Sequence, residues 1–333
     1  MKSTDVQLKR RPDGMPTPDD FQLVEVDVPA PGQGEVQVQN LCMSVDPYMR
    51  GRMVDRKSYV PPFQIGETLT GGAVGRIVAS EHPEYPEGAI VESHFGWREG
   101  FTAPAEQVKK LGELSAPASA YLGVLGMPGM TAYVGLFGAA SLEDGETVFV
   151  SGAAGAVGSI AGQIARIKGC TVIGSAGSAD KVNWLTADLG FNYAFDYHNA
   201  KLLAELRRGA PDGLDVYFDN VGGDHLEAAL FHMRPFGRIA LCGAISQYNA
   251  TAPVPGPSNL TMAIGLGLTL RGFIVSHFDH MADDFRRDMA AWVKDGSVKY
   301  QETIYDGIDK AADAFIGLFT GANVGKMIVR IAD

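Results

Sequence analysis

Short segments that alternate apolar and polar residues dominate the first third of the chain. Residues 21–28 (FQLVEVDV) and 34–41 (GEVQVQNL) alternate in this way, and a Pro/Gly turn at 29–32 separates them. Alternation with a period of two indicates strands that bury one face. The pattern continues at 70–79 and 88–92, where glycines suit bulges and sharp bends. This part of the chain is therefore predicted to form a small, partly closed β-barrel.

From about Ser119 the pattern changes to compact apolar strands that alternate with helices. A strand is predicted at 147–151, a helix at 160–168 and a second strand at 170–174. Strands separated by helices of this length need right-handed crossovers, so we expect a parallel sheet. A further helix is predicted at 181–188, and further strands at 215–219, 238–242 and 269–275. The predicted fold class is α/β, with a β-barrel domain and a parallel-sheet domain.

A chain of 333 residues is long enough for two domains. The segment from Tyr300 onward returns to mixed structure and could rejoin the first domain. We therefore expect residues 1–120, completed by 299–333, to form one domain. Residues 121–298 would then be a second domain inserted into the first.

The composition limits the kinds of molecule and the compartment that the protein is expected to meet. The formal net charge of −11 argues against a nucleic-acid or anionic-membrane surface, because both reward clusters of Lys and Arg. The most apolar stretch, 260–270, is too short to cross a bilayer, and residues 1–13 are too polar for a secretory signal. The three cysteines, Cys42, Cys170 and Cys242, are odd in number and far apart, which suits a reducing cytoplasm rather than a disulfide framework.

The strongest local signal is a glycine turn between a strand and a helix, at 148–158 (VFVSGAAGAVG). Against the dinucleotide fingerprint G-x-G-x-x-G, Ala153 replaces the first glycine, while Gly155 and Gly158 hold the second and third places. Without a Cβ at Gly155 the backbone can approach a pyrophosphate, and the helix that follows offers N–H groups and a positive dipole end. Strand, turn, helix and second strand follow in order, which favours cofactor binding over a purely structural turn.

The end of the second strand distinguishes NAD from NADP. NAD sites place an Asp or Glu there to bind the ribose 2′-hydroxyl. This chain has 174–178 (GSAGS) instead, with no carboxylate until Asp180 and with Lys181 following it. Small residues leave room for a 2′-phosphate, and Lys181 can balance its charge. The alternative is that Lys181 is an ordinary solvated helix residue.

With these residues in place, the chain resembles the medium-chain dehydrogenase/reductase superfamily. Within it, the resemblance is to the zinc-independent branch that contains prostaglandin reductase (leukotriene B4 12-hydroxydehydrogenase), the 2-alkenal double-bond reductases and the curcumin reductases. The motifs that carry it run nearly end to end: 44–50 (SVDPYMR), 66–68 (GET), 126–133 (GMPGMTAY), 153–158 (AAGAVG), 177–181 (GSADK), 218–222 (FDNVG), 242–249 (CGAISQYN) and 321–326 (GANVGK).

The resemblance implies a GroES-like barrel domain, a Rossmann domain and NADPH as the cofactor. It also implies which residues meet each part of the cofactor. The diphosphate would meet Gly155, Ala156, Val157 and Gly158, and the 2′-phosphate would meet Lys181 and Tyr197. The residues expected around the ribose and nicotinamide are Met130, Thr131, Asn220, Cys242, Gly243, Ala244, Ile245, Ser246, Tyr248, Phe273, Ile274, Val275 and Asn323.

No zinc site is expected. A catalytic zinc ion needs three protein ligands and one open position. The Gly-His-Glu of the zinc branch is replaced here by 66–68 (GET), and only three cysteines occur in the chain. His277 and His280 lack a recognisable third partner.

Without a Lewis acid, reduction of a carbon–carbon double bond conjugated to a carbonyl is the easier chemistry. Negative charge then develops on the carbonyl oxygen as an enolate, and neutral donors such as tyrosine hydroxyls can stabilise it. Three tyrosines are candidates: Tyr248 and Tyr59 as enolate partner or proton donor, and Tyr48 as a wall of the substrate site. The prostaglandin reductase branch has a tyrosine where this chain has Ser276, so that residue's role cannot be transferred.

Two other functions stay open from the sequence. One is an NADPH:quinone reductase of the same superfamily, and the other is a protein that binds NADPH without chemistry. The substrate is expected to be a small enone or enal molecule. The strand predicted at 269–275 would lie at the edge of its sheet, where pairing with a second copy would give a homodimer.

Overall fold

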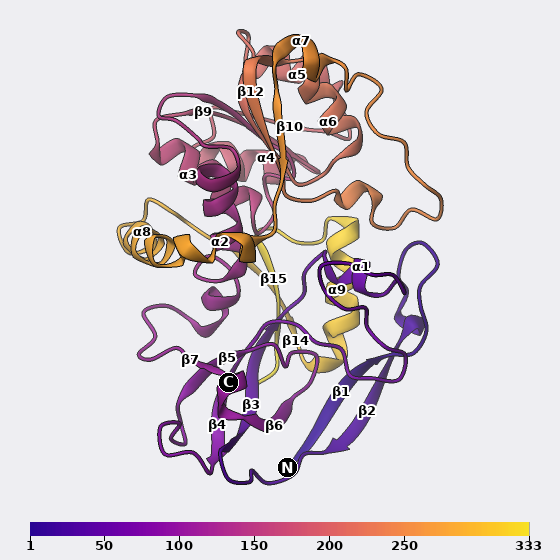
Figure 1. Ribbon diagram of the computed structural model, residues 1–333, viewed down its shortest axis with the longest axis vertical. Helices are drawn as coiled ribbons and strands as arrows, with labels where there is room; N and C mark the ends of the chain where they lie inside the picture. The colour runs from indigo at the N-terminus through magenta and orange to yellow at the C-terminus, as the bar shows by residue number, and fades with distance from the viewer. Residues whose placement is uncertain (333) are drawn as a thin grey trace. The chain divides into compact units, whose positions relative to one another are not determined.

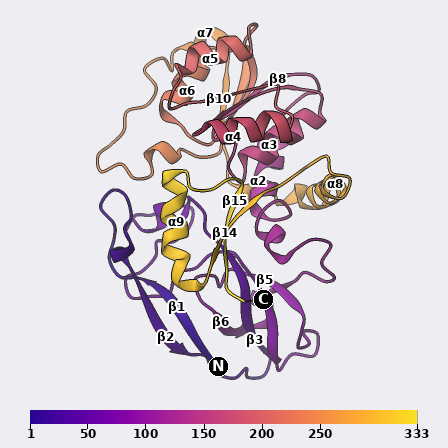
Figure 2. The same ribbon diagram turned by 180° about the vertical axis from the view of Figure 1, so that it is seen from behind.

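The computed structural model describes residues 1–332 and consists of two compact units (Figures 1 and 2). The first unit contains Met1–Leu122, Glu302–Asn323 and the residues from Met327. The second contains Gly123–Gln301 and Val324–Lys326. The chain thus leaves the first unit after residue 122 and returns to it near its C-terminal end.

The first unit is built mainly of antiparallel strands. Its elements are β1 Lys2–Leu8, β2 Phe21–Asp27, β3 Glu35–Ser44, α1 Met49–Arg52, β4 Ala73–Ser80, β5 Ile90–Ser93, β6 Gly100–Pro104, β7 Lys109–Lys110, β14 Glu302–Asp306, α9 Ala311–Thr320 and β15 Lys326–Arg330. Within residues 1–332, one sheet has the strand order β14-β15-β3-β4-β5-β7, and β6 also pairs with β3. β1 and β2 form a separate hairpin in full register from Lys2–Asp27 to Leu8–Phe21.

The C-terminal helix α9 belongs to the core of this unit. Phe315 on α9 packs edge-on against Trp97, with ring centroids 5.9 Å apart, and Phe21 stacks on the same indole at 6.0 Å. All three rings are buried. The last residues of the chain therefore complete a core that the first hundred residues begin, as the yellow helix in Figure 1 illustrates.

The second unit alternates strands and helices. Its elements are α2 Met127–Val134, β8 Thr147–Val150, α3 Gly158–Ile167, β9 Thr171–Ala176, α4 Ala179–Asn183, β10 Tyr193–Asp196, α5 Leu202–Gly209, β11 Leu214–Asp219, α6 Gly223–Leu230, β12 Met233–Leu241, α7 Met262–Leu266, β13 Thr269–Gly272 and α8 Ala282–Lys294. The strands form one parallel sheet in the order β10-β9-β8-β11-β12-β13. Numbered within the sheet, this is the order 3-2-1-4-5-6 of the doubly wound dinucleotide-binding fold. The predicted fold class is therefore confirmed.

Two local predictions for this sheet were incomplete. The strand β10 was not predicted at all. The strand predicted at 269–275 ends at Gly272. The next residue, Phe273, leaves the sheet edge and packs its ring against Phe218 and Phe278, with ring centroids 6.2 Å apart in each case. A 3-10 helix, Val275–Met281, follows. No helix in the described part of the chain is both long and apolar enough to span a membrane.

Candidate functional site

The glycine turn after β8 lies where a doubly wound sheet binds its ligand. The chain proceeds from β8 to β9 on one side, while β11 pairs with β8 on the other, so the carboxyl end of β8 is at the topological switch point. The turn needs one left-handed residue, and this is Gly152, with φ +57°. Sequence spacing assigned the first glycine position to Ala153, but that residue is buried and its amide donates to the carbonyl of Ser175 at 2.8 Å. Gly152 is thus a residue that the fingerprint missed.

The other two glycines of the turn have different surroundings. A Cβ at Gly158 would lie 2.5 Å from the carbonyl oxygen of Gly152 and 2.8 Å from the Cα of Ala153, so only glycine fits there. A Cβ at Gly155 would meet only the Gly152 carbonyl oxygen, at 3.3 Å. The backbone at Gly155 is therefore accessible to a ligand of the size of a phosphate.

The start of α3 supplies donors beside this open backbone. The amide of Ser159 makes the first helical bond, to the carbonyl of Gly155 at 3.1 Å, so the amides of residues 156–158 have no partner within the helix. Gly155, Ala156 and Val157 are half-buried. Gly325 crosses the turn and donates its amide to Ala154 at 2.8 Å. Free N–H groups at a helix N-terminus are the usual ligands of a diphosphate.

A buried carboxylate supports the next strand end. Asp219, the last residue of β11, accepts hydrogen bonds at Oδ1 from the Tyr217 hydroxyl (2.7 Å) and from the amides of Val221 (3.0 Å) and Gly222 (2.8 Å). Its own carbonyl accepts the amides of Cys242 (2.9 Å) and Gly243 (3.0 Å) after β12. Burial raises the pKa of Asp219, although these donors oppose the shift. Sequence reasoning noticed Asn220 and missed this residue.

Asn220 itself is held by the neighbouring strand. Its side-chain amide donates to the carbonyl of Ser151 at 2.8 Å, and its backbone amide donates to the Ser151 hydroxyl at 3.0 Å. Ser151 directly follows β8. The ends of β8 and β11 are therefore tied together beside the glycine turn.

The residues predicted for a 2′-phosphate follow two paired strands: Lys181 lies on α4 after β9, and Tyr197 directly follows β10. Ser178 caps α4 and accepts the amide of Lys181 at 3.4 Å. A Cβ at Gly177 would lie 3.1 Å from the hydroxyl of Tyr197, so that hydroxyl is directly above the turn. Lys181 and Tyr197 are both half-buried, and burial lowers the pKa of Lys181 and raises that of Tyr197.

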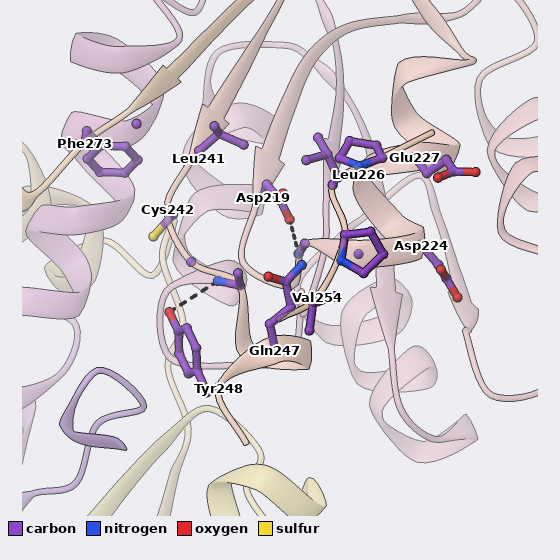
Figure 3. A pocket seen from close by; sticks show the side chains of 18 of the residues that line it. Asp219, Asp224, Leu226, Glu227, Leu241, Cys242, Gln247, Tyr248, Val254 and Phe273 are labelled. Atoms are coloured by element: carbon purple, nitrogen blue, oxygen red, sulfur yellow. Dashed lines mark hydrogen bonds between the residues drawn. The ribbon is translucent and has the colours of Figure 1, made fainter. Parts of the chain in front are cut away.

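A pocket of about 730 Å³ lies at the carboxyl ends of β11, β12 and β13 (Figure 3). In the figure, Phe273, Cys242 and Tyr248 lie on one side and Asp224 and Glu227 on the other. The pocket does not include the glycine turn or Lys181. Its lining is Asp219, Gly222, Gly223, Asp224, Leu226, Glu227, Leu241, Cys242, Gly243, Ala244, Gln247, Tyr248, Val254, Pro255, Gly256, Pro257, Gly272, Phe273, Ile274 and His277.

The loop after β12 brings several predicted residues into this pocket. A short 3-10 helix, Ile245–Gln247, turns the chain back so that the Tyr248 hydroxyl accepts the amide of Ala244 at 3.2 Å. Burial raises the pKa of Tyr248, so its hydroxyl stays protonated and can still donate. Burial likewise raises the pKa of the Cys242 thiol to about 12, which makes the thiol inert at neutral pH. Ser246 is exposed and donates to the carbonyl of Val221 at 2.6 Å.

Of the remaining predicted residues of this unit, Phe273 and Ile274 line the pocket, and the others lie in helices. The ring of Phe273 fills the space beside Gly135, where any Cβ would run into it. Ile274 lines the pocket, and Val275 begins the 3-10 helix that follows. Met130 and Thr131 are buried in α2, and the Thr131 hydroxyl donates to the carbonyl of Met127 at 2.8 Å.

In the first unit, Tyr48 and Tyr59 belong to one cluster with Arg52. Tyr48 precedes α1 in a helical conformation, so it shares a helix face with Arg52 four positions later. Arg52 lies over the ring of Phe63, 3.9 Å from its centroid, and donates to the Thr70 hydroxyl at 2.9 Å. Burial raises the pKa of Tyr48, whereas Tyr59 is 62% exposed. Asn323, also in this unit, is half-buried and directly precedes Val324–Lys326.

The residues considered as metal ligands are dispersed. Cys42 is buried in β3, and Gly66 adopts a left-handed turn with φ +79°. Within residues 1–332 there is no group of three or more His, Cys, Asp or Glu side chains that could hold a metal ion.

The sheet order and the open glycine turn, together with the β-rich first unit, define a two-domain dehydrogenase/reductase with a Rossmann nucleotide domain. Two family models match the chain: an N-terminal domain of oxidoreductase over residues 4–111, and a zinc-binding dehydrogenase domain over residues 156–295. Comparison with known proteins identifies a smaller group within this class. The NADPH-dependent curcumin reductase of Escherichia coli is 42% identical over 330 residues, which cover 98% of this chain and 96% of that protein.

Prostaglandin reductase 1 of Rattus norvegicus is 42% identical over 328 residues, which cover 97% of each protein. The crystal structure of CurA from Vibrio vulnificus in complex with NADPH superimposes with a TM-score of 0.94, at 39% identity and 99% coverage of both chains. This chain belongs to the medium-chain dehydrogenase/reductase family that contains the prostaglandin, curcumin and NADP-dependent 2-alkenal reductases. The resemblance identified from the sequence motifs is confirmed.

Proposed function

We propose that this protein is an NADPH-dependent reductase that adds hydride to the carbon–carbon double bond of α,β-unsaturated aldehydes and ketones. One observation carries the proposal. A backbone cradle at Gly155, open to a diphosphate, lies at the switch point of a sheet whose neighbouring strand ends line a pocket with tyrosine and apolar side chains. The family's NADP-dependent members, which are more than 40% identical over nearly the whole chain, support the same reading.

The residues present fit NADPH. The amides of residues 156–158 at the start of α3 would bind the diphosphate next to the open backbone of Gly155. Lys181 and Tyr197 would bind the 2′-phosphate, since no carboxylate lies directly at the end of β9 to bind a ribose hydroxyl and the first one, Asp180, lies on α4. The loop from Cys242 to Tyr248 and the backbone at Ile274 would line the ribose and nicotinamide. We expect Lys181→Ala to raise the KM for NADPH about tenfold, as for loss of a charge-assisted phosphate contact, and to leave the KM for NADH nearly unchanged.

When bound, NADPH supplies the hydride. The chain's own task is then to stabilise negative charge on the substrate's carbonyl oxygen and to deliver a proton. Tyr248 faces the pocket with a hydroxyl that accepts from its own loop and keeps its proton available for donation. Tyr59 and Tyr48, which belong to the first unit, stay predictions from the sequence for a second donor. The raised pKa values of Tyr48 and Tyr248 keep both phenols neutral at pH 7.

The test follows NADPH absorbance with a panel of 2-alkenals, enones and simple quinones. We expect turnover with the enals and enones, and a fall of about tenfold or more for Tyr248→Phe or Tyr59→Phe. Tyr85→Phe is a matched control, because the Tyr85 hydroxyl donates to Val108 within a separate apolar cluster. Turnover of quinones alone would identify a quinone reductase. NADPH binding with no turnover on the whole panel would identify a non-catalytic binding protein.

We also propose that the protein is a cytoplasmic homodimer. β13 is the edge strand of the parallel sheet, and Thr269, Arg271 and Gly272 along it are exposed. Two large apolar side chains near this edge are also exposed, Ile264 at 84% and Phe236 at 78%. An uncovered edge strand with apolar neighbours is typical of a pairing surface. The three cysteines form no disulfide, which supports a reducing compartment.

A further inference from the structure

The end of β10 carries a residue that none of the motifs assigned. His198 follows Tyr197, and the two rings are 4.3 Å apart. The His198 Nδ1 lies 3.1 Å from the carbonyl oxygen of Gly177, in the turn that follows β9. A Cβ placed on Gly177 would be 3.1 Å from the Tyr197 hydroxyl and 3.3 Å from Cε1 of His198. Both side chains therefore converge on the same point above the turn.

The polar atoms at this point have no protein partners to satisfy them. Within residues 1–332, neither the hydroxyl of Tyr197 nor Nε2 of His198 makes a hydrogen bond to another residue. The Tyr197 ring is held from beneath by the buried ring of His225, edge-on at 5.2 Å, so its hydroxyl is fixed and not merely exposed. A hydroxyl that is held in place and an imidazole nitrogen without a protein partner, near a lysine, are suited to a small polyanion.

The charges around His198 point to the same ligand. Asp196, at the end of β10, is the nearest carboxylate: its Oδ1 accepts the backbone amide of His198 at 3.0 Å and lies 3.5 Å from the ring Nδ1. Asp180 and Lys181 lie on α4, which packs against β10. Without a cation between them, Asp196 would repel a phosphate bound at Lys181. His198 is placed to offset that carboxylate.

We propose that His198 is a specificity-determining residue that binds the 2′-phosphate of NADPH together with Lys181 and Tyr197, and that this binding takes up a proton. The proposal rests on the NADPH use proposed above. When Nδ1 donates to the Gly177 carbonyl, Nε2 can donate to a phosphate oxygen only in the doubly protonated imidazolium.

The experiment measures binding of 2′,5′-ADP and of 5′-ADP by isothermal titration calorimetry at pH 7. These probes share the adenosine and differ only in the 2′-phosphate. For His198→Gln we expect about tenfold weaker binding of 2′,5′-ADP and unchanged binding of 5′-ADP, as for loss of one charge-assisted contact. His198→Lys should restore 2′,5′-ADP binding to within about threefold of wild type, because it returns the charge.

A second readout separates a contact from a merely structural role. Titrations in two buffers of different ionisation enthalpy give the number of protons taken up, and wild type should take up more protons with 2′,5′-ADP than His198→Gln does. Subtracting the variant removes the contribution of the phosphate's own ionisation. His280→Gln is the matched control, since His280 follows β13 at the opposite edge of the sheet from β10.

Equal 2′,5′-ADP affinity in wild type and His198→Gln would overturn the proposal, and so would an equal loss for both nucleotides, which would mean that the loop had collapsed. A wild-type protein that binds the two probes equally would overturn NADPH preference itself. These outcomes are distinct. The proposal about His198 can therefore fail while the proposed reductase activity stands.

Discussion

Replacement of the two glycines at the start of α3 by alanine should separate folding from cofactor binding. At Gly158 the added methyl would lie 2.5 Å from the Gly152 carbonyl oxygen, 2.8 Å from the Ala153 Cα and 3.0 Å from the Gly152 carbonyl carbon. All three are backbone atoms, so no side chain can rotate away. Overpacking of this kind costs about 1–3 kcal/mol. For a unit of this size, about 1 kcal/mol lowers Tm by about 2–4 °C, so Gly158→Ala should melt about 2–12 °C below wild type.

Gly155→Ala should behave in the opposite way. Its methyl would meet only the Gly152 carbonyl oxygen, at 3.3 Å, and the φ of Gly155 is not in the left-handed region. Alanine also restricts the unfolded chain, which contributes about 0.4–1 kcal/mol of stability. The apoprotein should therefore melt at or slightly above the wild-type temperature. The same methyl occupies the space through which a diphosphate reaches the backbone, so the KM for NADPH should rise about tenfold or more.

The assay is thermal unfolding by circular dichroism, without ligand and with saturating NADPH, together with the KM for NADPH. The ligand should raise the Tm of wild type far more than that of Gly155→Ala, because stabilisation by a ligand depends on its affinity. If Gly158→Ala melts within about 1 °C of wild type, the close packing of turn against helix is wrong. If Gly155→Ala binds NADPH as wild type does, the turn is not the diphosphate site.

Three further predictions concern other parts of the nucleotide domain. Burial lowers the pKa of His225 to about 4, whereas a histidine in the unfolded chain titrates near 6.5, so on acidification the unfolded chain takes up the proton before the folded one. The free energy of unfolding should therefore fall by about 3 kcal/mol as the pH drops from about 6.5 to about 4. In urea unfolding, His225→Phe should remove this part of the acid sensitivity. An unchanged slope with pH in the variant would contradict this. Ile264→Glu places a charge on the exposed apolar surface next to β13 and should convert a dimer to a monomer in light scattering; a dimer that persists would place the interface elsewhere. The Cys242 thiol, with a pKa of about 12, should react with iodoacetamide at pH 8 more than tenfold slower than in the unfolded chain, and fast alkylation would contradict its burial.

Much of the nucleotide domain could be predicted because most of its strands are recognisable from their own hydrophobic pattern. The residues of β8 are buried on both faces and read as a continuous apolar run, so the strand, the turn and α3 were located within a residue or two. β10 gave no such signal. It has only four residues, Tyr193–Asp196, with both terminal residues half-buried, and pairing with β9 alone makes it a strand. An edge strand of this length depends on tertiary pairing, which local patterns do not contain.

Sequence spacing also leaves out part of the geometry of the turn. Spacing located the glycine turn correctly but assigned its first position to Ala153, because the fingerprint counts residues and does not contain the sign of φ. The left-handed residue is set by which amide must reach the neighbouring strand. Here Ala153 donates to Ser175 on β9, which leaves the unusual backbone to Gly152. Phe273 was expected beside the nicotinamide from its motif; it lines the pocket together with Ile274, and its ring also packs beside Gly135.

Asp219 shows why the most consequential residue for the site's geometry was not among the candidates. It is not placed to react, because its Oδ1 is already occupied by the Tyr217 hydroxyl and by the two amides that begin the turn into α6. Its importance lies in what it connects. Its side chain orients the end of β11, its carbonyl anchors the loop after β12, and the neighbouring Asn220 is bonded to Ser151 at the end of β8. These bonds connect the ends of β8 and β11 with the loop after β12. A buried carboxylate oxygen that accepts several hydrogen bonds therefore marks Asp219 as a positioning residue, and such residues are recognised by their hydrogen bonds rather than by their sequence motif.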